Sequence, residues 1–386
     1  MSDHCSPTFA RLAGELGFSC RTEGGLVAFR NPFALENWTL PVLETTIVVG
    51  AVLTLSYAIS RLRRHGDPTN LVVWLGASAY LLIIEPPLYF PAAYGISGHV
   101  DTMFAHNVFT VDFLWGRLPL YIVAIYPFMA TLSFETVRML GVFRRNGVLA
   151  GAVCVGFVNQ AYYEIFDQLG PQLRWWEWST GNPLNQPMFA SVPLSSVVVF
   201  AALWPMSLAI FVRLLVGRHV DAGRRFSRPQ LAWRTVAAGV LGSVGTFVLP
   251  LPATLFGAHN TNVRGVLYAA ELIVLSLVAI PVLLRQWQRT RHEDSDDSTA
   301  PRYSNDVIRV YSVVYLGIMA LFWGVSLPDF LHATHGWARN GGPVGNLPYT
   351  LVCFALAILC TTAVLTTPRV RTATRPDSTP EVAAAS

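Results

Sequence analysis

The sequence contains no lysine, and all 27 of its basic residues are arginine. Codon bias is the simplest explanation, so we infer no particular need for guanidinium chemistry. Charge of either sign is also scarce, because only 13% of the 386 residues are charged, against roughly 25% in soluble domains. This shortfall excludes an ordinary soluble domain. It indicates that most of the chain lies in the bilayer interior, where charged side chains are costly. The hydrophobic fraction of 53% and the mean hydropathy of +0.44 predict an integral membrane protein.

Cysteine is scarce as well, and no pair has zinc-ribbon or CxxC spacing. Of the five cysteines, Cys154, Cys353 and Cys360 fall inside apolar runs, where we interpret them as packing residues. Cys5 and Cys20 share the N-terminal segment, and a disulfide between them is possible if this segment is extracytoplasmic.

Several catalytic signatures are absent. The sequence has no NxxxD…DxxxD pair of the prenyltransferase type, no GxSxG, no HExxH, no Walker loop and no GxGxxG after a strand. The first thirty residues also lack the basic, apolar and small-residue pattern of a signal peptide, so we expect the N-terminus to be retained. A net charge of +4 gives no reason to expect a nucleic-acid partner.

Long apolar windows dominate the rest of the chain. A membrane-spanning helix needs about 20 mostly apolar residues. Nine windows qualify, at 40–60, 70–90, 117–141, 147–169, 188–212, 231–256, 265–285, 306–327 and 347–367. With nine spans, 20 of the 27 arginines fall on the side of the C-terminus, and cytoplasmic loops are the arginine-rich ones. We therefore predict an all-α, polytopic helix bundle in the cell membrane, with the N-terminus outside and the C-terminus cytoplasmic.

Composition divides the chain into five parts. The expected parts are an extracytoplasmic segment at 1–39, a seven-helix core at 40–285, a flexible cytoplasmic loop at 286–305, two further membrane helices at 306–367 and a disordered cytoplasmic tail at 368–386. The loop is charged and rich in serine, and the tail is rich in proline, threonine and arginine, which is typical of solvated segments.

A polar stripe runs along the fourth span. Its members are Gln160, Tyr163, Glu164, Asp167 and Gln168, which share one helical face, and Asn159 borders them. Lipid cannot solvate such a stripe, so it must face the bundle or a wet cavity. The alternatives are a polar seam between helices and an end frayed into the outer headgroups. Tyr163, Glu164 and Asp167 are candidate catalytic residues, and Asn159 and Gln160 are candidate substrate-binding residues.

Glu85, before two prolines in the second span, is the other catalytic candidate. Its span contains no basic residue to pair with it, and a carboxyl group buried without a countercharge tends to keep its proton. Glu85 is thus a candidate general acid or proton carrier, or alternatively a hydrogen-bonded residue that stabilises the proline break. We predict that Glu85 and Glu164 share one cavity in the outer half of the membrane. Glu135, with Arg138 three residues on, is interpreted as a surface ion pair.

The loops on the outer side supply further candidates for binding. Tryptophans at the edge of a span are typical of an aromatic belt, but Trp175 and Trp176 can alternatively form an apolar lid that contacts a lipid substrate. Asp112 and Glu271 are candidate substrate-binding acids on the same side. The histidines available to a metal are His99, His106, His332 and His335, and none has the spacing of a known site. We predict no metal and no other cofactor.

These acids and aromatic residues fit two functions from different classes. An integral membrane enzyme would use Glu85 as acid and Glu164 or Asp167 as base to cyclise, hydrate or isomerise an isoprenoid or lipid. That chemistry is similar in kind to the chemistry of integral-membrane terpene cyclases and carotenoid hydratases, without a shared motif. A proton- or cation-coupled secondary transporter would use the same acids as a relay, and a non-catalytic scaffold subunit is the third possibility. The expected partners are the bilayer and a hydrophobic small molecule.

Overall fold

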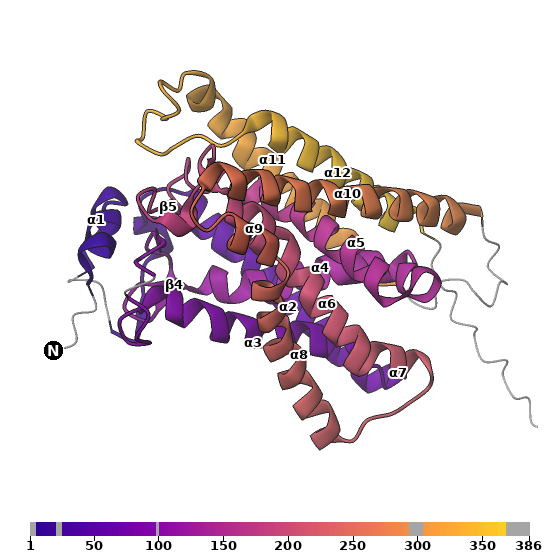
Figure 1. Ribbon diagram of the computed structural model, residues 1–386. Coiled ribbons are helices and arrows are strands. Elements are labelled where there is room, and N and C mark those ends of the chain that lie inside the picture. The colour runs from indigo at the N-terminus through magenta and orange to yellow at the C-terminus, as the bar shows by residue number, and fades with distance from the viewer. Residues whose placement is uncertain (1–4, 21–24, 98–99, 293–303, 368–386) are drawn as a thin grey trace, which may run out of the picture.

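The computed structural model describes residues 5–20, 25–97, 100–292 and 304–367. Within these residues, nine helices are long and apolar enough to cross a membrane, the same number as the apolar windows of the sequence. They are α2 (Thr39–His65), α3 (Thr69–Tyr89), α4 (Leu120–Met139), α5 (Val142–Asp167), the composite helix Ser196–Asp221, α8 (Arg228–Val248), α10 (Thr261–His292), α11 (Asp306–Leu331) and α12 (Leu347–Thr366). Most of them run side by side, and α8 lies obliquely at the edge of the bundle (Figure 1).

The fifth span is built from four consecutive helical segments. They are the π-helix η3 (Ser196–Leu203), α6 (Trp204–Val212), the π-helix η4 (Arg213–Gly217) and α7 (Arg218–Asp221). π-Helical turns are rare and occur frequently at functional sites. This span begins later than the apolar window at 188–212, because β6 (Met188–Phe189) and β7 (Val192–Pro193) form a short hairpin before it.

Two of the expected segments, the loop and the tail, can be compared with the structure only in part. The helix α10 continues to His292, so the loop expected at 286–305 begins at least seven residues later than predicted. The remainder of that loop at 293–303 and the tail at 368–386 lie outside the described residues.

A cap of short elements closes one end of the bundle (Figure 1). It contains α1 (Pro7–Glu15), β1 (Val27–Phe29), β2 (Phe104–His106), β3 (Val111–Phe113), β4 (Leu118–Pro119) and β5 (Trp176–Trp178), and other short helices are η1 (Pro32–Ala34), η2 (Pro183–Asn185) and α9 (Leu251–Phe256). The strands form a β1-β3-β4 antiparallel sheet and a two-stranded β2-β5 ribbon. A disulfide joins Cys5 to Cys20 across α1, with their Cα atoms 5.9 Å apart.

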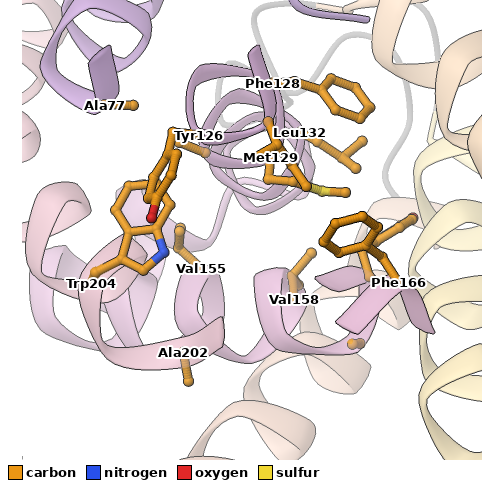
Figure 2. Packing of buried hydrophobic residues seen from close by; sticks show 14 of the residues in the cluster. Ala77, Tyr126, Phe128, Met129, Leu132, Val155, Val158, Phe166, Ala202 and Trp204 are labelled. Carbon is orange, nitrogen blue, oxygen red and sulfur yellow. The ribbon is translucent and has the colours of Figure 1, made fainter. Parts of the chain in front are cut away.

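Aromatic side chains fill the bundle below the cap. Trp204 of α6 stacks on Tyr80 of α3, with ring centroids 4.7 Å apart, and its ring lies 5.3 Å from that of Tyr126 on α4. Figure 2 shows Tyr126 and Trp204 packed together among smaller side chains. This packing holds α3, α4 and α6 in a fixed relative position. Two of these helices, α3 and α4, also carry residues of the candidate functional site described below.

A buried ionic cluster lies at the opposite end of the bundle, and it corrects one prediction. Glu135, interpreted from the sequence as a surface residue, is only 1% exposed. Its carboxylate accepts hydrogen bonds from Arg138 (3.3 Å) and from Asn305 at the start of α11 (3.0 Å). Arg138 also donates to Asp67 (2.6 Å) and Asn70 (2.7 Å). The surface interpretation was wrong because α11, remote in sequence, covers this end of α4.

Candidate functional site

A cavity lies where α3, α4, α5 and η3 meet the β2-β5 ribbon. It holds about 440 Å³ of space, counting its open mouth. Its lining residues are Glu85, Phe104, His106, Ile122, Ile125, Tyr126, Tyr163, Phe166, Asp167, Trp176, Trp178, Ser196 and Phe200. A smaller space of about 220 Å³, reaching Met129 and Trp204, shares four of these residues. We call the larger space the carboxylate cavity.

Glu85 enters this cavity from near the end of α3. It is buried, and its Oε1 accepts a hydrogen bond from the Tyr126 hydroxyl. The Tyr89 hydroxyl lies close to the same carboxyl group but outside hydrogen-bonding geometry. Within the described residues Oε2 has no hydrogen-bond partner, and none of the described residues that line the cavity is arginine. Glu85 therefore has one oxygen available to a bound molecule.

Asp167, the last residue of α5, enters the same cavity from another side. It is fully buried, and its Oδ2 accepts a 2.8 Å hydrogen bond from the Ser196 hydroxyl at the start of η3. Its Oδ1 has no partner among the residues that the structure describes. Tyr163, one turn earlier on α5, also lines the cavity. The cavity is thus flanked by two carboxyl groups, each held through one oxygen only.

The cap contributes aromatic groups with polar edges. His106 and Trp176 are paired across the β2-β5 ribbon, as are Phe104 and Trp178. The indole N–H groups of Trp176 and Trp178 are buried and have no acceptor within the described part of the chain. Burial lowers the pKa of His106 to about 3, so its imidazole is neutral at physiological pH. A hydrogen bond of 3.0 Å joins its Nδ1 to the Tyr121 hydroxyl.

The polar stripe of α5 divides between two surroundings. Tyr163 and Asp167 face the carboxylate cavity, but Glu164 is not among its lining residues. Glu164 is fully buried, accepts a 3.2 Å hydrogen bond from Gln168 and lies close to Tyr349 of α12. Gln160 donates to the Tyr349 hydroxyl (2.5 Å). The stripe is enclosed by protein, as predicted, but Asp167 takes the place beside Glu85 that we had expected for Glu164.

The remaining candidates lie elsewhere. Asn159 donates to the Ala201 carbonyl (2.8 Å) and so ties α5 to η3. Trp175 is fully buried behind the cavity wall, so neither it nor Trp176 belongs to an exposed aromatic belt. Asp112 is buried and ion-paired with Arg30; burial raises its pKa to about 7 against the opposing effect of that arginine. Glu271 is half-buried on α10, and neither it nor Asp112 lines the cavity.

The histidines do not assemble a metal centre in the described structure. His332 and His335 are exposed in the connection after α11, and His99 lies outside the described residues. Of the described histidines among these candidates, His106 is the one that lines the cavity. Within the described ranges, no group of three or more His, Cys, Asp or Glu side chains is placed to hold a metal ion.

Sequence reasoning missed several lining residues. Tyr126 and Ser196 were overlooked because a single hydroxyl in an apolar span carries no local signal. Trp178 had a usable one, since the alternation Trp176-Glu177-Trp178 is the pattern of a strand with both indoles on one face. The pairing of that strand with β2 was not available from local sequence.

Comparison with known proteins places the chain in a family. A family model described as a domain of unknown function (DUF7802) matches residues 30–328. The chain belongs to the DUF7802 family. All lining residues of the carboxylate cavity fall within the DUF7802 match, whereas α1 and α12 lie outside it. No curated protein and no solved structure matches the chain.

Proposed function

We propose that this protein is an integral membrane enzyme that performs acid-base chemistry on a hydrophobic substrate, an isoprenoid or a lipid. The observation that carries the proposal is the placement of Glu85 and Asp167 in one aromatic cavity, each with an oxygen that has no partner among the described residues. General acid-base catalysis needs two such groups within reach of one bound molecule.

In this proposal Glu85 is the acid and Asp167 is the base. Glu85, hydrogen-bonded by Tyr126 and without an arginine among the described lining residues, delivers a proton to an alkene carbon. Asp167, positioned by Ser196, removes a proton from the neighbouring carbon in isomerisation or cyclisation, or from an attacking water in hydration. Exchange with solvent restores both groups to their starting states. The aromatic walls stabilise the intervening cation, because ring faces attract positive charge.

The lining also suggests the kind of substrate. Most of the wall is apolar, which favours a hydrocarbon body. The unpartnered indole N–H groups of Trp176 and Trp178 are donors available to one oxygen-containing group on that body. An isoprenoid with a single hydroxyl or carbonyl group satisfies both requirements.

The orientation that we propose is N-terminus outside and C-terminus cytoplasmic, in the cell membrane. Its support is the distribution of arginine, of which 20 of 27 fall on the side of the C-terminus. The cap and the carboxylate cavity then belong to the outer half of the protein. The Cys5–Cys20 disulfide agrees with this side, because disulfides persist in oxidising compartments.

Deuterium uptake tests the proposed chemistry. The purified protein in phosphatidylcholine nanodiscs is incubated in D₂O with farnesol, geranylgeraniol or squalene as probes, and products are analysed by mass spectrometry. We expect deuterium at a former alkene carbon with wild-type protein, and a loss of this signal in Glu85→Gln. Absence of any deuterated product from all three probes with folded wild-type protein contradicts the enzyme proposal for isoprenoids.

Secondary transport is the second candidate, and the π-helix η3 beside Asp167 favours it. π-Helical geometry is frequent at functional sites, and a buried carboxylate beside it within a membrane helix bundle is a candidate proton relay. The same protein in liposomes, loaded with a pH-sensitive dye, distinguishes the two functions. A proton flux that requires Glu85, without deuterium uptake into any probe, would favour a transporter over an enzyme.

A further inference from the structure

A second cavity, with a polar lining, lies at the cap end between α2 and α11. It holds about 570 Å³ of space, counting its open mouth. The residues that matter for its chemistry are Asn37, Trp38, Gln172, Ser326, Asp329 and Asn340. They come from the start of α2, the connection between α5 and β5, the end of α11 and the connection between α11 and α12. No part of the proposed acid-base chemistry uses this cavity.

Gln172 presents a buried acceptor to this cavity. The side chain is only 1% exposed, and its Nε2 donates a 2.9 Å hydrogen bond to the Ser326 carbonyl. This bond fixes the amide and leaves Oε1 without a hydrogen-bond partner among the described residues. A buried acceptor without a partner is unfavourable, so the geometry favours a ligand that supplies a donor.

The amides around Gln172 are already held in place. Asn340 donates to the Gln172 carbonyl (2.8 Å) and accepts from the Gly342 N–H (3.0 Å). Asn37 accepts from the Thr39 N–H (3.0 Å) and donates to a neighbouring carbonyl. A ligand therefore meets a preorganised polar surface, which reduces the entropic cost of binding.

Asp329 and Trp38 complete the site with a carboxylate and a ring face. Asp329 is half-buried, and its side chain forms no hydrogen bond or ion pair with other residues in the described ranges. The Trp38 side chain is 52% exposed, and its ring lies 5.7 Å from Phe322. The cavity thus combines acceptors for hydroxyl groups with an apolar surface on which the C–H face of a sugar ring can stack.

We propose that this cavity binds a neutral pyranose sugar. Its hydroxyl groups donate to Gln172 Oε1 and to Asp329, and its ring packs on Trp38. Of the described lining residues none is arginine, which disfavours a phosphate ligand. Sites for quaternary ammonium ions typically enclose the cation in a cage of several aromatic rings. Trp38 alone does not form such a cage, which disfavours that class of ligand. The sugar is either free or the headgroup of a glycolipid, since both present the same chemistry.

Binding is measured on the full chain in phosphatidylcholine nanodiscs, without sugar-based detergent. The probes are methyl α-D-glucopyranoside, methyl α-D-mannopyranoside and methyl β-D-galactopyranoside, followed by saturation-transfer NMR and tryptophan fluorescence. We expect at least one probe to bind in the millimolar range. Asp329→Asn and Trp38→Ala should each weaken binding by about tenfold or more. Trp337→Ala is the matched control, because Trp337 is 49% exposed but does not line the cavity.

Nanodiscs that contain a glucosyl diacylglycerol distinguish the two sources. If its headgroup is the ligand, it competes with the bound methyl glycoside; if it does not compete, the site takes free sugar. Failure of all three glycosides to bind overturns the proposal, as does binding that survives both variants. Binding of tetramethylammonium in their place also overturns it. None of these outcomes depends on deuterium uptake, so this proposal and the proposed enzyme are tested separately.

Discussion

Glu85 of α3 and Asp167 of α5 line one cavity, and each keeps a carboxylate oxygen that has no partner among the described residues. The other oxygen of each group is held by a hydroxyl, from Tyr126 for Glu85 and from Ser196 for Asp167. The two acids therefore have similar but separate supports. Their separate supports make it possible to change one acid without directly removing a hydrogen bond of the other.

We expect Glu85→Gln and Asp167→Asn to keep the fold and to reduce deuterium uptake by about 100-fold or more, because an amide cannot deliver or accept the proton. Glu271→Gln is the matched control, since Glu271 is a half-buried acid on α10 that does not line the cavity, and its uptake should stay within about twofold of wild type. Rates are measured by mass spectrometry, and folding by thermal unfolding. Full activity in Glu85→Gln removes its proton-transfer role.

The division of the α5 stripe makes a second prediction. Glu164 contacts Gln168 and the start of α12 instead of the cavity, so Glu164→Gln should reduce deuterium uptake less than Asp167→Asn does. The same assay compares the two variants at equal protein stability. An equal or larger loss in Glu164→Gln would assign the base to the residue that we first expected.

Reporter fusions test the proposed orientation. We expect fusions after Arg64, Arg145, Arg225 and Asp297 to report the cytoplasm, and fusions after Gly98, Asn182, Asn260 and Asn340 to report the outside. The physical reason is the arginine asymmetry of the loops. Two or more loops with reversed signals would contradict the orientation.

The buried ionic cluster at the end of the bundle opposite the cap predicts that the folded state loses stability in acid. Burial acts to raise the pKa of Asp67, but Arg138 and Thr69 outweigh it and hold that pKa well below its usual range. Because the pKa is lower in the folded state, the ionised group stabilises the fold above about pH 4 and loses this contribution as pH falls further. Asp67→Asn should cost about 3 kcal/mol near neutral pH, since it removes a charge partner of a buried arginine.

Thermal unfolding between about pH 3 and 7 checks this prediction. The matched control is Glu15→Gln, which removes an exposed ion pair with Arg11 and should cost well under about 1 kcal/mol. If the two variants lose equal stability, the cluster contributes no more than a surface pair.

The disulfide across α1 gives the last prediction. Replacing Cys5 and Cys20 by serine should weaken the N-terminal segment by about 3 kcal/mol, the loop-entropy value for a closed loop of this length. Trypsin should then cleave faster at the exposed Arg11. Reductant should accelerate cleavage of wild type to the same rate and leave the variant unchanged. Equal rates for oxidised wild type and variant would show that the disulfide does not hold α1.

Hydropathy was sufficient to predict the nine long apolar helices, because the signal is local and repeats in every helix. The shared face of the α5 stripe was also predictable from helical periodicity. Its division was not, since it depends on which neighbour covers each side: the carboxylate cavity beside Asp167 and α12 beside Glu164. The error at Glu135 has the same cause, because Asn305 reaches it from far along the chain.

The cap was not predicted at all, for a different reason. Its strands are two or three residues long, too short for a period-two pattern to stand out. The pairing of β2 with β5 joins segments on both sides of α4 and α5, as when Phe104 pairs with Trp178. This non-local pairing brings the tryptophans inward, where a purely local interpretation had placed them in the membrane interface.

Trp175 links the walls of the two cavities. Its ring contacts Phe166 and Trp176, which line the carboxylate cavity, while its indole N–H donates to Thr39 of the polar cavity (2.8 Å). The residue therefore lies behind the walls of both cavities, against Phe166 and Trp176 on one side and Thr39 on the other. Because one side chain makes the ring contacts and the hydrogen bond together, a change at Trp175 disturbs the walls of both cavities at once.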